Sequence, residues 1–134
     1  MTPLRLVDTS VWIEVFRKPS QFDLISVVSL DEVVTCLPVI QEVLQGFSDE
    51  RAFRIARDAM FALPILESPV SPGVYEEAVQ LFRSARRVGV TVRSSVDCLI
   101  AACAIRHGIP VLHRDRNFSL LARVSSLKEH KVTV

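Results

Sequence analysis

Short apolar segments alternate with segments of helical periodicity along this 134-residue chain. The pattern predicts strands at 4–7, 32–36, 64–66 and 109–112, with a possible last strand at 131–134. Helices are predicted from about position 11 and over 21–29, 38–46, 48–63, 71–89, 96–107 and 118–122. Strands separated by helices must be joined by crossovers, so we expect a mostly parallel sheet with helices on both faces. The chain is therefore predicted to be a single α/β domain.

Four acidic residues lie beside apolar runs, where acids are normally excluded. Carboxylates at the edge of a core are costly to desolvate unless a cation or hydrogen-bond donors pair with them. Parallel α/β sheets bind ligands at the carboxyl ends of their strands, and two of these acids follow predicted strands. Mg²⁺ and Mn²⁺ prefer oxygen ligands, so the sequence predicts a divalent metal site at this edge. The four acids are Asp8, Glu42, Asp97 and Asp115.

Three of the acids also have ordinary explanations when each is taken alone. Asp8 could be a turn residue before the hydroxyls of Thr9 and Ser10, which can cap the first helix. Asp97 could complete a capping box three residues after a serine, and Asp115 could pair with its flanking arginines. Glu42 interrupts an apolar helical stretch, where a solvated acid has little reason to lie. The hypothesis of a metal site fails only if each of these ordinary explanations is correct at the same time.

The net charge of +1 includes the four acids, and the rest of the chain has an excess of basic residues. Without the four acids, 16 basic residues face 11 acidic ones, and 13 of the bases are arginine. The guanidinium fork matches phosphate oxygens. Four arginines, at positions 83, 86, 87 and 93, lie within eleven residues and form either a phosphate-binding cluster or a solvated helix face.

Composition indicates an oligomer without a membrane segment. The longest apolar run, 98–105, is far shorter than the ~18 residues of a membrane span, and no N-terminal signal pattern is visible. A cytoplasmic protein is expected. The hydrophobic content of 49% favours an apolar face for a partner. The cysteines Cys36, Cys98 and Cys103 lack the close pairing of a zinc site and are predicted to be reduced core residues.

The acidic segments resemble the motifs of the PIN-domain ribonucleases, and among these the VapC-type toxins of bacterial toxin–antitoxin modules. Residues 6–13, Leu-Val-Asp-Thr-Ser-Val-Trp-Ile, are similar to the opening motif, and residues 39–46 to the second. Residues 97–104 resemble the third motif, usually Asp-x-Leu-Ile-Ala-Ala, and residues 113–118 the fourth. The resemblance runs nearly end to end. Two positions depart from it: Asn117 stands where many relatives have Asp, and His113 where Ser or Thr is common.

The resemblance implies a three-layer α/β/α fold with a five-stranded parallel sheet, in one PIN domain over residues 1–134. It also implies endonucleolytic cleavage of RNA by water that is activated on Mg²⁺ or Mn²⁺. The four acids would hold the metal, with Asn117 as a weaker ligand, and Thr9 and Ser10 would orient a carboxylate or water. Expected RNA contacts are Arg83, Arg86, Arg87, Arg114, Arg116 and His113.

The expected partners are an RNA substrate, a second copy of the chain and a VapB-type antitoxin whose C-terminal segment covers the acidic pocket. Two alternatives remain open within the family. The chain could be a PIN-like domain that binds RNA or protein without cleavage, or a housekeeping PIN nuclease outside a toxin–antitoxin module.

Two other classes of parallel α/β protein do not fit. The haloacid-dehalogenase-like phosphatases need an acid at position 10, where this chain has Ser10. Receiver domains need paired acids after the first strand, an aspartate after the third and a lysine after the fifth. No aspartate follows residues 65–66 and no suitable lysine is present.

Overall fold

Five short strands form one parallel sheet in the order β3-β2-β1-β4-β5. The computed structural model describes residues 3–17 and 22–133. Every residue of β2 and β4 is buried, which explains why these strands are largely apolar instead of alternating, with Thr35 and His113 as their polar residues. The predicted parallel five-stranded sheet is confirmed. The strands are β1 (Arg5–Val7), β2 (Val33–Cys36), β3 (Ile65–Leu66), β4 (Val111–His113) and β5 (Glu129–Lys131).

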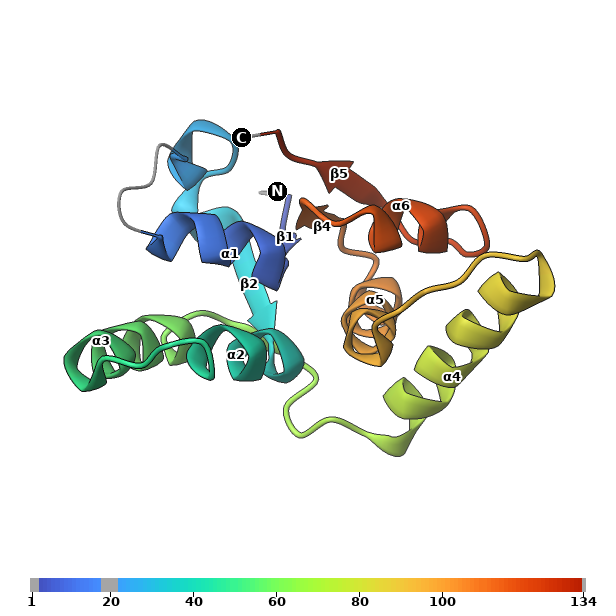
Figure 1. The fold of residues 1–134 in the computed structure, drawn as a ribbon, viewed down its shortest axis with the longest axis horizontal. Helices are drawn as coiled ribbons and strands as arrows, with labels where there is room; N and C mark the ends of the chain where they lie inside the picture. The colour runs from blue at the N-terminus through green and yellow to red at the C-terminus, as the bar shows by residue number, and fades with distance from the viewer. Residues whose placement is uncertain (1–2, 18–21, 134) are drawn as a thin grey trace.

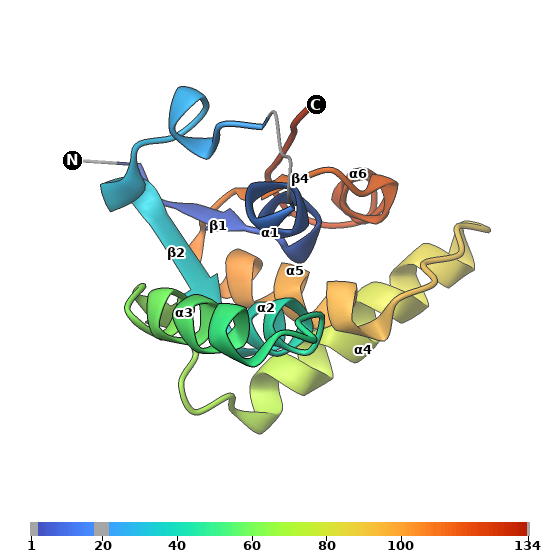
Figure 2. The same ribbon diagram turned by 60° about the vertical axis from the view of Figure 1, so that its left-hand side comes forward.

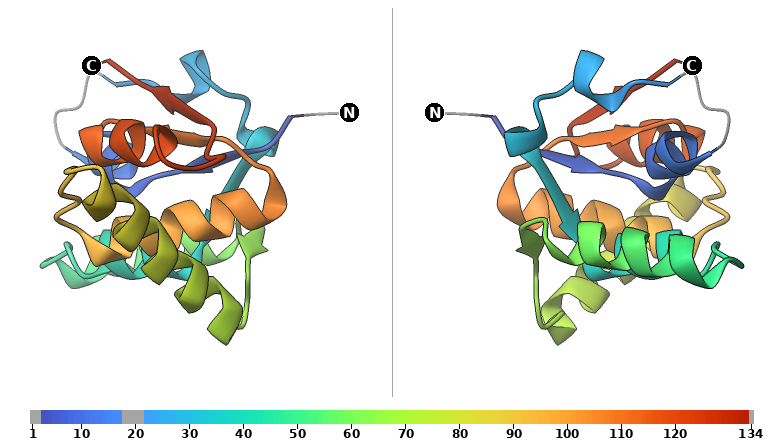
Figure 3. Two further views of the ribbon diagram at one scale, coloured as in Figure 1. Left: turned by 90° about the vertical axis from the view of Figure 1, so that its right-hand side faces the viewer. Right: turned by 90° about the vertical axis from the view of Figure 1, so that its left-hand side faces the viewer.

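Helices cover both faces of the sheet. In Figure 1, α1, α2 and α3 lie on one side, and α4, α5 and α6 on the other. Figure 2 shows α2 and α3 side by side, and Figure 3 (left) shows α4 crossing the outer surface of α5. This is the predicted three-layer architecture. The helices are α1 (Thr9–Phe16), α2 (Leu37–Leu44), α3 (Glu50–Phe61), α4 (Pro72–Arg87), α5 (Ser95–His107) and α6 (Arg116–Ala122).

The strand order reverses between β1 and β4, which lie next to each other. Val7 pairs with Leu112, and the backbone N–H of Asp8 donates to the Leu112 carbonyl oxygen over 2.9 Å. The connections from β1 to β2 and β3 run toward one edge of the sheet, while those from β3 to β4 and β5 run toward the other. A crevice opens at such a reversal, at the carboxyl ends of the strands.

Helix α5 supplies much of the core, because small and apolar residues surround its axis. Residues 100–104 of this helix are fully buried, and α4 packs against the outer side of α5. All three cysteines are free and buried, as predicted, and desolvation raises the pKa of Cys98 to about 11. None of the helices in the described ranges is long and apolar enough to cross a membrane.

Two predicted N-terminal features are wrong. The cap of α1 is Asp8, not Thr9 or Ser10, because the Asp8 carboxylate accepts the Ser10 N–H. The helix predicted over 21–29 is only a 3₁₀ turn, Leu24–Ser26, within the described residues; position 21 lies outside them. Asp23 caps this turn, and a second 3₁₀ turn, Leu30–Glu32, begins after Ser29. The two caps divide the apolar pattern into separate turns.

Two C-terminal boundaries also shift. The last helix begins at Arg116 instead of position 118, because the Asp115 carboxylate accepts the Asn117 N–H and caps the helix. The last strand occupies Glu129–Lys131 instead of 131–134, and position 134 lies outside the described residues. The earlier strand places Glu129 beside Val111 of β4, in the register of the parallel ladder.

Candidate metal centre

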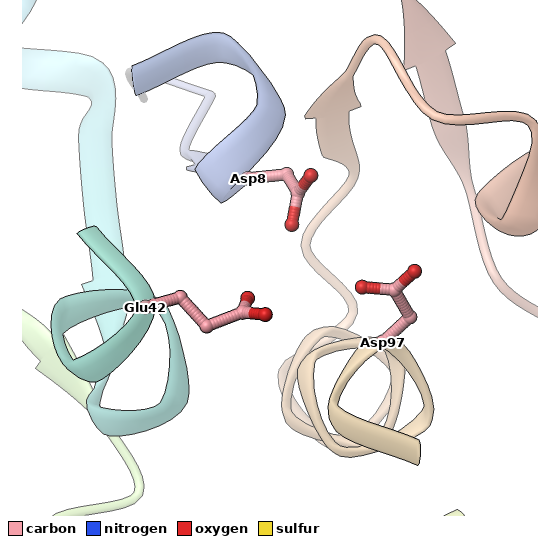
Figure 4. Close-up of side chains that lie close together, drawn as sticks. All are labelled: Asp8, Glu42 and Asp97. Carbon is pink, nitrogen blue, oxygen red and sulfur yellow. The ribbon is translucent and has the colours of Figure 1, made fainter. Parts of the chain in front are cut away.

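Three carboxylates from distant parts of the sequence meet at the crevice. Asp8 follows β1, Glu42 lies in α2, and Asp97 lies in the first turn of α5. One oxygen atom from each carboxylate lies within 4.8 Å of the other two. Figure 4 shows the three side chains directed toward a common centre. The fold therefore brings together three of the four acids that were predicted to form one site.

Asp8 is almost wholly buried, with 2% of its surface exposed. Its Oδ2 accepts hydrogen bonds from the Ser10 backbone N–H, over 3.0 Å, and from the Ser10 hydroxyl, over 2.6 Å. Its Oδ1 is buried and has no hydrogen-bond partner among the described residues. Desolvation raises the pKa of Asp8, although the bonds from Ser10 act in the opposite direction. One oxygen is thus held in place while the other needs a positive partner.

Glu42 reaches the centre from the middle of α2. The Thr9 hydroxyl donates to its Oε1 over 2.8 Å, so the two hydroxyls after β1 each hold a different acid. Burial raises the pKa of Glu42, and the negative charges of Asp8 and Asp115 add to this effect. The acid that interrupts the apolar stretch of α2 is therefore directed into the site.

Asp97 is held by an amide instead of a hydroxyl. The Asn117 Nδ2 donates to Asp97 Oδ2 over 2.9 Å, and the Ser94 hydroxyl accepts the Asp97 backbone N–H. Desolvation raises the pKa of Asp97 to about 7, the Asn117 bond opposes this, and the other three acids add to it. Because the Asn117 nitrogen faces the carboxylate, Asn117 serves here as a hydrogen-bond donor to Asp97.

The three carboxylates fit a hard divalent cation. Each one has a raised pKa, because burial and mutual repulsion disfavour three negative charges in one place. A cation at their centre would remove this penalty and give the unpaired Oδ1 of Asp8 a partner. An all-oxygen donor set is typical of Mg²⁺ and Mn²⁺ sites, not of zinc sites.

Asp115 lies at the rim of the centre, outside the group of three. Its negative charge helps to raise the pKa of each of the three acids, so it is close enough to act on them. One of its oxygens caps α6 through the Asn117 N–H, over 2.9 Å. Asp115 thus combines a structural cap with a charge that would attract a cation.

Arg114 is anchored by a residue that the sequence reasoning missed. Its Nη1 lies 3.1 Å from Oε1 of Glu14, a buried acid that also contacts Arg17 over 3.3 Å. The Arg114 backbone N–H donates to the Ser10 hydroxyl. Glu14 interrupts the apolar run of α1 in the same way as Glu42 interrupts α2, and that pattern could have identified it.

His113 was predicted to contact RNA, but the structure contradicts this because its side chain is fully buried, with 0% exposed. It is the last residue of β4, and its side chain contacts Glu129 of β5 and Phe118 of α6. Its Nε2 is 3.0 Å from the Glu129 carboxylate, which also accepts the Ser119 hydroxyl over 2.6 Å. No spacing in the sequence indicated this contact.

Three arginines of the predicted cluster are exposed on the last turns of α4, and the fourth, Arg93, is exposed in the loop that follows. Arg83, Arg86 and Arg87 line a shallow hollow together with Phe82. Phe82 also lines a second hollow with Ser95, which is two residues before Asp97. The cluster therefore adjoins the end of α5 that carries the acidic centre, without being part of it.

Asn117→Asp is expected to destabilise the metal-free protein by about 1–3 kcal/mol, because a carboxylate would replace the donor that now satisfies Asp97. Thermal melts at pH 8 in EDTA would measure this loss. Added Mn²⁺ should then stabilise the variant more than the wild type, since the new charge needs a cation. Asn117→Ala is the control, because it removes the hydrogen bond without adding charge. An Asn117→Asp variant that melts like the wild type in EDTA would contradict this account.

Known proteins share both the sequence pattern and the fold. A family model for the PIN domain matches residues 5–124. The ribonuclease VapC11 of Mycobacterium tuberculosis is 37% identical over 129 residues, covering 92% of this chain and 95% of that protein. The VapBC-5 structure from M. tuberculosis superposes with a TM-score of 0.72 at 23% identity, covering 97% of this chain and 100% of the other. VapBC2 from Rickettsia felis, bound to a promoter DNA fragment, gives a TM-score of 0.75 at 13% identity, with 97% and 99% coverage. The chain therefore belongs to the PIN domain family, and within it to the VapC ribonucleases.

Proposed function

We propose that this protein is a Mg²⁺- or Mn²⁺-dependent endoribonuclease that acts as the toxin of a toxin–antitoxin pair. One observation carries the metal-dependent chemistry: two buried carboxylates and one half-buried carboxylate converge from the end of β1, α5 and α2, and the Asp8 Oδ1 lacks a hydrogen-bond partner among the described residues. The 37% identity to a VapC ribonuclease over most of the chain supports the choice of RNA as substrate.

Asp8, Glu42 and Asp97 would hold the ion, with Asp115 at the rim acting directly or through water. When bound, the ion would supply Lewis-acid chemistry, activating water and offsetting the charge that builds on the phosphate. The protein itself fixes the carboxylates: Ser10 holds Asp8, Thr9 holds Glu42, and Asn117 holds Asp97. Groups that orient ligands in this way sustain affinity for the ion.

Basic side chains around the centre would hold the RNA backbone. Arg114 and Arg116 flank Asp115, and the α4 cluster of Arg83, Arg86 and Arg87 adjoins the start of α5. Contacts to phosphates position a nucleic acid but carry little sequence information. The pairing of Arg114 with Glu14 would keep its guanidinium close to the rim.

A VapB-type antitoxin would regulate the enzyme by covering the centre. A groove of about 410 Å³ between α1 and the end of α2 is lined by Glu42 and by apolar side chains that include Ile13, Phe16 and Phe47. A peptide lying in this groove would reach the Glu42 carboxylate. The fold is also similar to that of VapBC toxin–antitoxin structures, which is consistent with such a partner.

The protein would also form a homodimer through an apolar surface on α4. Tyr75, Val79 and Phe82 are all exposed on this helix, and with Leu99 of α5 they line a hollow of about 390 Å³. Contiguous apolar patches of this kind are typical of protein–protein interfaces. A second copy of the chain would remove these side chains from water.

Cleavage of total cellular RNA by the antitoxin-free protein tests the proposed activity. With Mn²⁺ or Mg²⁺ we expect discrete fragments, and with EDTA we expect none, because the carboxylates alone cannot neutralise the phosphate. Sequencing the fragment ends would identify the substrate. A folded protein that leaves RNA intact under both metals would contradict the proposal and favour a PIN-like domain that binds without cutting.

A further inference from the structure

The segment after β4 presents two successive backbone N–H groups to side-chain acceptors. The Arg114 N–H donates to the Ser10 hydroxyl over 2.9 Å, and the Asp115 N–H donates to His113 Nδ1 over 3.1 Å. Ser10 in turn donates to Asp8 Oδ2. The first amide is therefore tied to the acidic centre, and the second is tied to the buried imidazole.

The hydrogen bonds of His113 determine its tautomer. A backbone N–H can only donate, so Nδ1 must present its lone pair to Asp115 and the ring proton must lie on Nε2. Nε2 then donates to Glu129 Oε1 over 3.0 Å. Hydrogen bonds from Ser119 and His113 lower the pKa of Glu129, which keeps it a charged acceptor.

Packing holds the ring in the same orientation. The imidazole centroid lies 5.2 Å from that of Phe118, and both side chains are fully buried. Glu129 comes from β5, and its second partner, Ser119, comes from α6. The ring is therefore fixed by two elements that contribute no acid to the metal centre.

The backbone at Asp115 controls two polar groups of the site. The Asp115 carboxylate accepts the Asn117 N–H at the start of α6, and the Asn117 amide donates to Asp97. A shift of this backbone would displace the rim charge and the donor to Asp97 together.

We propose that His113 is a positioning residue of the metal centre: its Nδ1 fixes the Asp115 backbone, while Glu129 and Ser119 fix the ring from behind. This backbone in turn positions the Asp115 carboxylate at the rim of the centre. It also positions the Asn117 amide that donates to Asp97. This role rests on the proposed function, because it assumes that the acidic centre binds a divalent cation. His113 acts only through Asp115 and contacts neither metal nor RNA.

Two substitutions separate the hydrogen bond of His113 Nδ1 from that of His113 Nε2. In His113→Asn, the amide oxygen can take the place of Nδ1 and still accept the Asp115 N–H. In His113→Gln, the longer side chain places its amide nitrogen near the position of Nε2, so the contact with Glu129 can survive while the acceptor for Asp115 is lost. Both variants are neutral and polar, and both remove the aromatic ring from Phe118, so each is a matched control for the other.

The test combines amide hydrogen exchange at Asp115, measured by NMR without metal, with calorimetric titration of Mn²⁺. We expect the His113→Asn variant to protect the Asp115 amide and to bind Mn²⁺ nearly as the wild type does. The His113→Gln variant should lose that protection and bind Mn²⁺ about 10–100-fold more weakly. Equal behaviour of the two variants, or a His113→Gln variant that matches the wild type, would overturn the proposal.

Ser119→Ala provides a test in which the imidazole remains in place. It removes the second hydrogen bond to Glu129 and should increase exchange at Asp115 and weaken Mn²⁺ binding, by less than His113→Gln does. Unchanged exchange in this variant would contradict the role of Glu129 and Ser119. A wild-type protein that binds no Mn²⁺ would instead overturn the proposed function, and exchange at Asp115 would still decide whether His113 holds this backbone.

Discussion

Asp97→Asn is expected to reduce metal-dependent RNA cleavage by about 100-fold or more while leaving the fold intact. The amide has the shape of the carboxylate, and its oxygen can still accept the hydrogen bond from Asn117. It lacks the negative charge that a divalent cation requires from the first turn of α5. Initial rates of RNA cleavage at saturating Mn²⁺, compared with the wild type, would measure the loss.

Asp58→Asn is the matched control for this substitution. Asp58 is an exposed acid of α3 whose observed partner is the neighbouring Arg57, so its replacement should leave cleavage unchanged. Circular dichroism and thermal melting would show that both variants are folded. A folded Asp97→Asn variant with full activity would remove Asp97 from the site.

The second large effect concerns stability in the absence of metal. Wild-type protein in EDTA should lose stability relative to Asp97→Asn as the pH rises from about 4 to about 7. Burial raises the pKa of Asp97 to about 7 from the ordinary 3.8, so within this interval the folded protein retains a proton that the unfolded chain has released. Unfolding then releases a proton, and a rising pH favours it.

The amide introduced by Asp97→Asn cannot ionise, so the variant should avoid this penalty. The difference in stability should be small at pH 4 and reach on the order of 4 kcal/mol in favour of the variant above pH 7. Mn²⁺ should reverse the order at pH 8, because the ion stabilises the three charged carboxylates of the wild type. Thermal melts from pH 4 to pH 8, with EDTA and with Mn²⁺, would measure both effects. Identical melting of the two proteins in EDTA at pH 8 would show that Asp97 carries no burial penalty.

The sheet and the three converging acids could be predicted because they depend on local patterns. Buried parallel strands are continuous apolar runs, and an acid that directly follows or interrupts such a run has few structural reasons to be there. The reversal of strand order between β1 and β4 then places Asp8 beside the end of β4. Glu42 and Asp97 complete the group from the helices beside this crevice.

The remaining details depend on contacts that sequence spacing does not record. The bond from His113 to Glu129 joins residues 16 positions apart across a strand pair, and Arg114 meets Glu14 from the far end of the chain. The role of the Asn117 amide also depends on the fold, because α6 brings it beside Asp97, whose carboxylate accepts a hydrogen bond from the amide nitrogen.

The helix expected over 21–29 failed for a different reason. Apolar residues at 24, 25, 27 and 28 satisfy a helical period, but Asp23 and Ser29 each begin a separate short turn. Asp23 accepts the Ile25 N–H, and the Ser29 N–H donates to the Glu32 carboxylate. Side-chain caps of this kind compete with helix formation and can end an apolar pattern after one turn.

Calorimetric titration of the metal-free protein with Mn²⁺ tests most directly whether the acidic centre is a metal site. The wild type should bind Mn²⁺ at pH 7.5, and Asp8→Asn, Glu42→Gln and Asp97→Asn should each weaken binding at least tenfold, while Asp58→Asn should not. Binding that is absent from the wild type, or that persists unchanged in all three variants, would contradict the account.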